Sequence, residues 1–288
     1  MQNKFPTTEV AGIVLPRLII GCNWISGFSH RSASSDAMIN RYHNAPDPTA
    51  GVLEAFLEYD VNAVLGLFAA DPNLLKAVKL AEERTNKQII LMDEPTINTE
   101  DTPSARREAQ KIINECAKRG AKFCLPLHSC IEQLVNKGKQ TIDRLPDYLY
   151  MIREAGMVPG LSAHMPEIIQ YADANEYDVE TYIQIFNCMG FLMQIEIESV
   201  ASIIHYAKKP VITIKPLAAG RTTPYVGLTF SWNAIRKQDM VCLGCLHPDE
   251  VHEDIEISYA ALERRLPQIK HRCSPNVTSV IKGGTIEK

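Results

Sequence analysis

Ionisable side chains come directly after several short apolar runs of this chain. Asp93 and Glu94 follow one such run, and His128, His164 and Lys215 follow three others. Histidine titrates near neutral pH, so these residue types form a set that could act as general acids and bases. His128, His164 and Glu94 could also serve as ligands of a divalent metal ion. The ordinary structural alternative is that each histidine hydrogen-bonds a loop carbonyl.

The two carboxylates and the lysine carry further expectations. Asp93 and Glu94 are adjacent, and neighbouring residues of a strand point to opposite faces, so we expect only one of them to enter a shared site. Lys215 could form a Schiff base if it is desolvated, because a buried lysine loses its proton readily. Pairing of Lys215 with a carboxylate at the rim of the site is the favoured interpretation.

A second group of residues is suited to substrate binding and comprises Asn23, Trp24, His30, Arg31 and Asn187. The indole of Trp24 offers a flat apolar face on which a sugar ring could stack. His30 and Arg31 offer donors for a carboxylate, a phosphate or sugar hydroxyls. The alternative for these two residues is a solvated loop without a ligand.

The elements that must position these residues alternate along the chain. Eight short apolar runs are separated by amphipathic, helix-like stretches. The apolar runs cover residues 18–21, 63–68, 88–92, 123–127, 158–161, 182–186, 211–214 and 240–243. Strands that alternate with helices form parallel sheets, whose strands are covered on both faces. Eight such units predict an α/β fold, a single-domain (β/α)8 TIM barrel over residues 1–288. An open doubly wound sheet is the alternative. The polar segment 26–48 is predicted to be a long loop over the barrel mouth.

Composition excludes some classes of partner. The 288 residues carry a formal net charge of −4, so no basic surface for nucleic acid is expected. No apolar run approaches the roughly 18 residues of a membrane span. The eight cysteines, together with an N-terminus that lacks an apolar signal region, favour reduced thiols and a cytoplasmic location. The expected partner is a small molecule, and homo-oligomerisation stays open.

Several segments, taken in order, resemble the aldo-keto reductase superfamily. They include Leu125-Pro-Leu-His128, which is similar to the strand that ends in that family's active-site histidine, and Lys215-Pro-Leu-Ala-Ala-Gly220, which is similar to its Pro-Leu-x-x-Gly signature. The other matching segments are residues 18–24, 59–64, 156–164, 182–187 and 241–255. The resemblance implies a barrel with a ligand site at the C-terminal mouth. It also implies a nicotinamide near Gln184 and Ser162.

The chain departs from this family where the chemistry is done. The family's reductases use Asp, Tyr, Lys and His around the substrate carbonyl, and the tyrosine supplies the proton. Aligned on Asp60-Val-Asn62, the Asp position is Leu65, the Tyr position is Ala70, and the Lys position falls within residues 92–94. Only His128 is retained. The resemblance therefore implies a degenerate reductase site.

The residues expected to bind a cofactor phosphate have changed as well. Where the family places an Arg on the adenosine 2′-phosphate this chain has Glu250, and where it has a closing Asn this chain has Asp254. Negative charge at both positions argues against NADP. The cofactor is left unassigned, with a divalent metal ion as one candidate.

Three functions remain open from the sequence. The first is an enzyme that acts on a small polar molecule, a sugar or a keto acid, by proton transfer or metal-assisted chemistry. The second is a residual NAD(P)-dependent oxidoreductase with a rebuilt site. The third is a non-catalytic protein that binds a small molecule, because a fold does not by itself carry a function.

Overall fold

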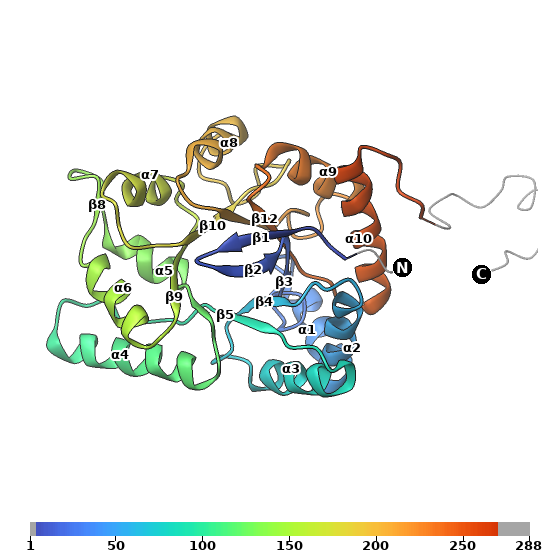
Figure 1. The fold of residues 1–288 in the computed structure, drawn as a ribbon, viewed down its shortest axis with the longest axis horizontal. Helices are drawn as coiled ribbons and strands as arrows, with labels where there is room; N and C mark the ends of the chain where they lie inside the picture. The colour runs from blue at the N-terminus through green and yellow to red at the C-terminus, as the bar shows by residue number, and fades with distance from the viewer. Residues whose placement is uncertain (1–3, 270–288) are drawn as a thin grey trace, which may run out of the picture.

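The computed structural model describes residues 4–269, which form a closed barrel of eight parallel strands (Figure 1). Around the barrel these are β3 (Leu18–Gly21), β4 (Ala63–Gly66), β5 (Ile90–Asp93), β6 (Phe123–Cys124), β9 (Val158–Ala163), β10 (Thr181–Ile185), β11 (Val211–Ile214) and β12 (Met240–Leu243). β12 pairs with β3 and closes the barrel. Each strand overlaps one of the eight apolar runs, so the predicted (β/α)8 barrel is confirmed.

Apolar side chains cover both faces of the barrel wall. Ile19, Met92 and Phe123 belong to one buried cluster, which also contains Ile183 from the opposite side of the barrel. The neighbours of Ile19 along β3 belong to a second, larger cluster that includes the helices. Strands buried on both faces read as continuous apolar runs rather than alternating ones, which is why the pattern could be read from the sequence.

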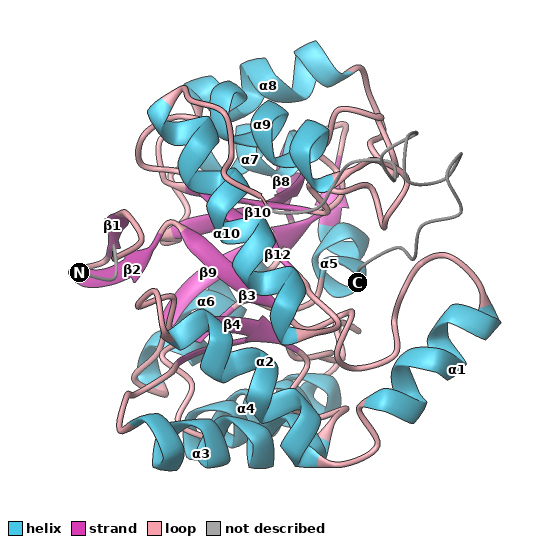
Figure 2. Cartoon of the chain, turned by 90° about the vertical axis from the view of Figure 1, so that its right-hand side faces the viewer, coloured by secondary structure: helices cyan, strands magenta, loops and turns pink. Residues whose placement is uncertain are grey.

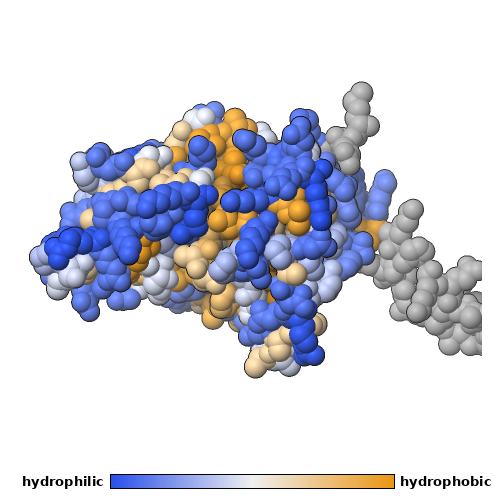
Figure 3. All heavy atoms as spheres, turned by 90° about the horizontal axis from the view of Figure 1, so that it is seen from below, coloured by the Kyte–Doolittle hydropathy of each residue, from blue (hydrophilic) through white to orange (hydrophobic). Residues whose placement is uncertain are grey.

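Helices cover the outside of the barrel, and most of them begin with a proline. They are α2 (Pro46–Leu57), α3 (Pro72–Thr85), α4 (Pro103–Lys118), α6 (Leu145–Glu154), α7 (Glu167–Ala174), α8 (Ile197–Tyr206), α9 (Pro224–Ala234) and α10 (Pro248–Glu263). Proline suits a first helical position because its ring fixes φ and the missing N–H has no partner there. Thr102 and Thr223 cap α4 and α9 through their side chains. The outward faces of α3 and α4 are largely hydrophilic (Figure 3).

The two ends of the barrel are built differently. A hairpin of β1 (Thr7–Val10) and β2 (Ile13–Pro16) lies across the N-terminal end (Figures 1 and 2). Val10 and Leu15 of this hairpin join the cluster inside the barrel and close that end. At the C-terminal end, β6 is followed by α5 (His128–Ile131), a 3-10 turn (Glu132–Leu134) and a short hairpin of β7 (Val135–Asn136) and β8 (Thr141–Ile142).

The segment 26–48 differs from the predicted long loop. It contains α1 (Ala33–Tyr42), and its last residues enter α2. Figure 2 shows α1 beyond the mouth end of the barrel, away from the other helices. Only Ile39 of α1 is buried, so the helix has no apolar stripe that its sequence could reveal. Its start depends instead on Ser32, whose side chain caps the first turn, and on Asp36 within that turn.

No helix in residues 4–269 is long and apolar enough to cross a membrane. The cysteines of this part of the chain are all unpaired, and Cys242 and Cys245 are buried on opposite sides of the strand end. Cys273, which was counted with the reduced thiols, lies outside the described residues.

Candidate functional site

A cavity of about 550 Å³ opens at the C-terminal ends of β3, β11 and β12. This is the end of the barrel at which the ligand site was predicted, and the end where such barrels carry their chemistry. The predicted residues that line the cavity are Asn23, Trp24, His30, Arg31, Glu94 and Lys215. Apolar groups from Leu65, Ile214 and Leu243 complete its walls.

Glu94 follows β5 and turns its carboxylate toward the cavity. Its Oε1 accepts a hydrogen bond of 2.8 Å from the hydroxyl of Ser162 on β9. Burial among the strand ends raises the pKa of Glu94, and the Ser162 bond together with the charges of His128 and Lys215 offsets part of that rise. A carboxyl with a raised pKa is suited to accept and release protons near neutral pH.

Asp93, predicted as a catalytic candidate, lies outside the cavity. It is only 1% exposed, and its Oδ2 accepts hydrogen bonds of 2.8 and 3.1 Å from the guanidinium of Arg119, at the end of α4. The expectation that only one of the two adjacent carboxylates enters the mouth agrees with this arrangement. Alternation along the strand sends Glu94 to the cavity and Asp93 to the helix layer.

Lys215 follows β11 and has a left-handed backbone conformation, with φ of 60°. Its Nζ lies 3.0 Å from Nε2 of His30, whereas a carboxylate partner was the favoured prediction. No carboxylate within the described residues lies within ion-pair distance of this ammonium group. Burial lowers the pKa of Lys215, although the nearby charge of Glu94 opposes the shift.

His30 connects Lys215 to the segment that follows β3. Its Nε2 lies 3.2 Å from the amide nitrogen of Asn23 as well as 3.0 Å from Nζ of Lys215. An amide nitrogen can only donate, so Nε2 of His30 is the acceptor and the ring proton sits on Nδ1. Partial burial and the charge of Lys215 lower the pKa of His30. Arg221 donates to the backbone carbonyl of His30 over 3.2 Å and fixes this part of the segment.

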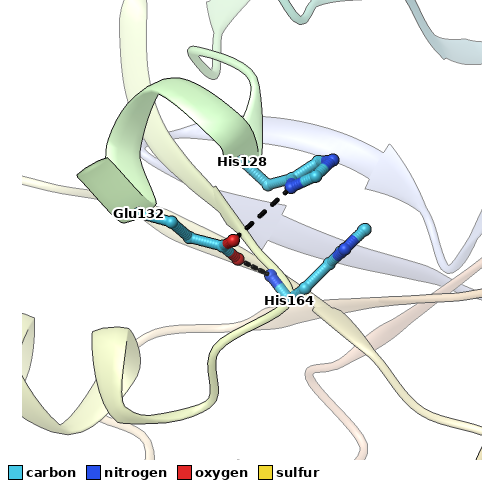
Figure 4. A group of neighbouring side chains, drawn as sticks. All are labelled: His128, Glu132 and His164. Carbon is cyan, nitrogen blue, oxygen red and sulfur yellow. Dashed lines mark hydrogen bonds and ion pairs between the residues drawn. The ribbon is translucent and has the colours of Figure 1, made fainter. Parts of the chain in front are cut away.

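His128 and His164 lie side by side (Figure 4), and neither of them lines the cavity. Their rings stack with centroids 3.6 Å apart and an angle of 17° between the planes. The carboxylate near them is Glu132. Its Oε2 lies 3.7 Å from Nδ1 of His128, and its Oε1 accepts from the backbone N–H groups of His164 (2.6 Å) and Met165 (3.0 Å).

Charges around this histidine pair shift two pKa values. Burial, followed by the charges of His128 and Lys215, lowers the pKa of His164 to about 4. Burial alone pushes the pKa of Glu132 upward, but the His128 contact and the two backbone N–H groups outweigh it and leave the pKa below its ordinary value. His164 is therefore neutral and Glu132 is ionised at neutral pH.

The predicted metal set of His128, His164 and Glu94 needs revision. Glu94 is bonded to Ser162, and the carboxylate that groups with the two histidines is Glu132, with the donor atoms within 4.8 Å of one another. Sequence reasoning missed Glu132, although its spacing of four residues after His128 places both on one helical face. The two rings lie in nearly parallel planes, and a histidine nitrogen binds a metal ion in the plane of its ring, so a shared metal ion requires a rotation of one ring.

Two other predicted residues do not reach the cavity. Asn187, predicted to bind substrate, is buried and holds a turn, because its Oδ1 accepts from the N–H groups of Met189 (3.2 Å) and Phe191 (2.9 Å). Gln184, a predicted cofactor contact, is fully buried, and its amide donates to the carbonyls of Ile185 and His164. The other predicted cofactor contact, Ser162, donates to Glu94.

The two positions aligned with missing reductase residues lie in different surroundings. Leu65 lines the cavity, whereas Ala70 lies on the exposed turn before α3. Among the described residues that line the cavity there is no tyrosine. At its outer end the cavity reaches the first turns of α10, where Glu250 and Asp254 line it. Glu250 also accepts from the backbone N–H of Leu246 over 2.7 Å.

No protein-family model and no curated protein sequence matches this chain. Solved structures do match its fold. A protein assigned to the aldo-keto reductases from Pseudomonas aeruginosa has a TM-score of 0.63 at 12% identity, with 89% of this chain and 95% of that chain covered. An aldo/keto reductase from Klebsiella pneumoniae, solved with NADP and acetate, has a TM-score of 0.54 at 14% identity and covers 95% and 99% of the two chains.

The barrel is also shared more widely. Orotidine 5′-monophosphate decarboxylase from Methanocaldococcus jannaschii has a TM-score of 0.50 at 13% identity, with 86% and 97% of the two chains covered. Likeness at these identities shows that the chain has a barrel like that of the aldo-keto reductases. It leaves the chemistry to be argued from the site.

Proposed function

We propose that this protein is an enzyme that catalyses proton transfer on a small polar molecule, a sugar or a keto acid, bound in the cavity at the barrel mouth. The observation that carries the proposal is Glu94, which faces the same cavity as Lys215 without a direct ion pair between them. Their environments shift the pKa of the carboxyl upward and that of the ammonium downward. Both shifts bring the two groups toward the pH at which acid–base catalysis is efficient.

Each lining residue then has a role. Glu94 takes a proton from carbon or oxygen of the substrate, and Ser162 fixes the orientation of its carboxylate through a bond of 2.8 Å. Lys215 lies where it can stabilise negative charge that develops on a substrate oxygen. Trp24 supplies a flat wall, and Arg31 supplies a fork of donors at the rim.

Hydride chemistry with NAD(P) is disfavoured by this arrangement. Within residues 4–269 the cavity lining contains no tyrosine to donate the proton, and carboxylates line its outer end, where a phosphate of the cofactor is expected. A titration with NADH and NADPH, followed by cofactor fluorescence, tests this alternative. Saturable binding in the cavity would revive the oxidoreductase function.

Isotope exchange tests the proposal even though the full reaction is not yet identified. In D₂O, the enzyme is expected to exchange the hydrogens next to the carbonyl of 2-oxo acids or ketoses, which proton NMR follows directly. Glu94→Gln is expected to slow the exchange strongly, whereas Glu83→Gln, on the exposed face of α3, leaves it unchanged. If 2-oxo acids and ketoses bind to the protein but neither class exchanges its hydrogens, the result favours a non-catalytic protein that binds a small molecule.

Metal-assisted chemistry is the second candidate, because His128, Glu132 and His164 bring three donor groups within 4.8 Å. These residues approach Glu94 closely enough for the charge of His128 to act on its pKa. Titration with Zn²⁺ in a calorimeter decides this candidate. A stoichiometric site that Glu132→Gln weakens and Glu83→Gln does not would support it, and heats that reflect only weak surface binding would remove it.

A further inference from the structure

We infer that Lys215 forms a covalent imine with the carbonyl group of the substrate. This inference rests on the proposed function, because it concerns the same cavity, and it names the substrate class as small carbonyl compounds. Imine formation requires a lysine that is uncharged for part of the time, reachable by a carbonyl carbon, and accompanied by groups that can move protons.

The surroundings of Lys215 meet the first requirement. Other lysines of the described residues, such as Lys4, Lys87 and Lys137, form ion pairs with carboxylates at 2.7–3.1 Å. Lys215 contacts the acceptor nitrogen of His30 instead. It is also flanked by apolar lining groups from Ile214 and from residues 216–217. Burial without a carboxylate at ion-pair distance favours the uncharged amine, and it outweighs the opposing charge of Glu94.

Backbone geometry supports the same assignment. Lys215, Ala218 and Ala219 all have positive φ, at 60°, 49° and 55°. A left-handed backbone conformation is unfavourable for residues other than glycine. Residues that are held in this conformation cluster at functional sites. Here it turns the chain at the end of β11, and Lys215 and Ala219 both line the cavity.

The neighbouring groups can move the protons that imine formation requires. The lone pair of neutral Nζ attacks the carbonyl carbon, and the carbonyl π bond breaks toward oxygen. Nε2 of His30, 3.0 Å from Nζ, takes one proton from the nitrogen and passes it to the alkoxide oxygen, which becomes the hydroxyl of a carbinolamine. Protonated Glu94 then gives its proton to this hydroxyl, which leaves as water as the carbon–nitrogen double bond forms. The nitrogen keeps its remaining hydrogen, so the loss of water gives the iminium directly.

The same groups then serve the proton transfer of the proposed function. The iminium draws electrons from the adjacent carbon–hydrogen bond, which makes that hydrogen more acidic than it is beside a free carbonyl. Glu94, now ionised, is the base that removes it. Because the pKa of Glu94 is raised above its ordinary value, the carboxyl is more readily protonated for the acid step and is a stronger base once ionised.

Arg31 narrows the substrate class. Its guanidinium lines the cavity, and within residues 4–269 no carboxylate lies within ion-pair distance of it. A planar fork of donors is matched by a carboxylate, which it binds in a bidentate manner. A 2-oxo acid presents a carboxylate directly beside its carbonyl group. We therefore expect 2-oxo acids to form the imine more readily than neutral ketoses.

Borohydride trapping tests the imine. The protein is incubated with pyruvate or with dihydroxyacetone, reduced with sodium borohydride, and measured by intact mass and by peptide mapping. The expected result is one reduced adduct per chain, on Lys215, formed more readily with pyruvate. Peptide mapping of the wild type identifies the lysine even if a variant fails to fold. Lys215→Arg is expected to lose the adduct, and the exposed Lys79→Arg is expected to keep it.

Two results would overturn the imine. One is the absence of an adduct with both compounds, and the other is an adduct spread over exposed lysines. Hydrogen exchange by the same preparations separates this failure from that of the proposed function. Exchange that needs Glu94 but persists in Lys215→Arg removes the imine and leaves the proton transfer intact. Trapping on Lys215 without any exchange removes the proton transfer instead.

Discussion

Buried charges lie at both ends of the barrel, but they are satisfied to very different degrees. At the N-terminal end, Asp239 is fully buried and accepts from the backbone N–H of Val211 and from the backbone and guanidinium of Arg236. Arg17 donates to the backbone carbonyl of Asp239 over 2.9 Å.

At the mouth, the charged groups have fewer partners. The carboxylate of Glu94 accepts a hydrogen bond from Ser162, and the Lys215 ammonium group hydrogen-bonds to His30.

The number of hydrogen-bond partners distinguishes charges expected to stabilise the fold from charges expected to take part in the reaction. Removing a carboxylate whose lone pairs are all engaged leaves its buried partners unpaired. A carboxylate that is desolvated and only partly engaged is costly to keep ionised, and it exchanges its proton readily. The comparison predicts that the N-terminal cluster of Arg17, Arg236 and Asp239 supports the fold. It predicts that the mouth pair of Glu94 and Lys215 supports the reaction.

The largest expected effect is on the mouth pair. Glu94→Gln is expected to slow hydrogen exchange by about 10²–10⁴-fold, because the group that moves the proton is lost. The free energy of unfolding should not fall, since the amide avoids the desolvation that burial imposes on a carboxylate. Urea denaturation measures the second quantity. A large loss of stability in this variant would place Glu94 with the structural charges.

Asp239→Ala provides the opposite test. It leaves Arg236 without its carboxylate partner, and breaking a buried pair of this kind costs about 3–5 kcal/mol of unfolding free energy. The rate of hydrogen exchange per folded molecule should be unchanged. Asp178→Ala is the matched control, because its ion pair with Arg153 lies on the surface and is worth about 1 kcal/mol or less. Equal losses in the two variants would contradict the comparison.

How much the sequence predicts depends on the range of the interactions. The eight strands are predicted because burial on both faces leaves a local apolar signature. The contact of Lys215 with His30 joins residues 185 positions apart, so no local pattern could reveal it. Asp93 and Glu94 could be separated in principle by alternation, but the sequence does not show which face turns inward. Glu132 carries a usable signal, its spacing from His128, that the sequence prediction did not use.

The pH dependence of stability tests the histidine pair at the C-terminal end of the barrel, next to the mouth. His164 has a pKa lowered from 6.5 to about 4, so the folded state resists the protonation that the unfolded state accepts. The stability that this shift contributes is fully present above pH 6.5 and is lost as the pH falls toward about 4. His164→Asn is expected to flatten that part of the stability curve. His205→Asn, at an exposed site, should leave the slope unchanged.

The smallest expected effect concerns the hydroxyl that holds Glu94. Ser162→Ala removes a hydrogen bond that lowers the pKa of this carboxyl, so its pKa should rise further. The acidic limb of the pH–rate profile for hydrogen exchange should move to higher pH accordingly, with a smaller change in the maximal rate. Ser231→Ala is the control, because its buried hydroxyl donates to the carbonyl of Gly227 over 2.8 Å, in α9. A profile that moves equally in both variants would mean that general loosening of the barrel, and not the Ser162 contact, sets the protonation of Glu94.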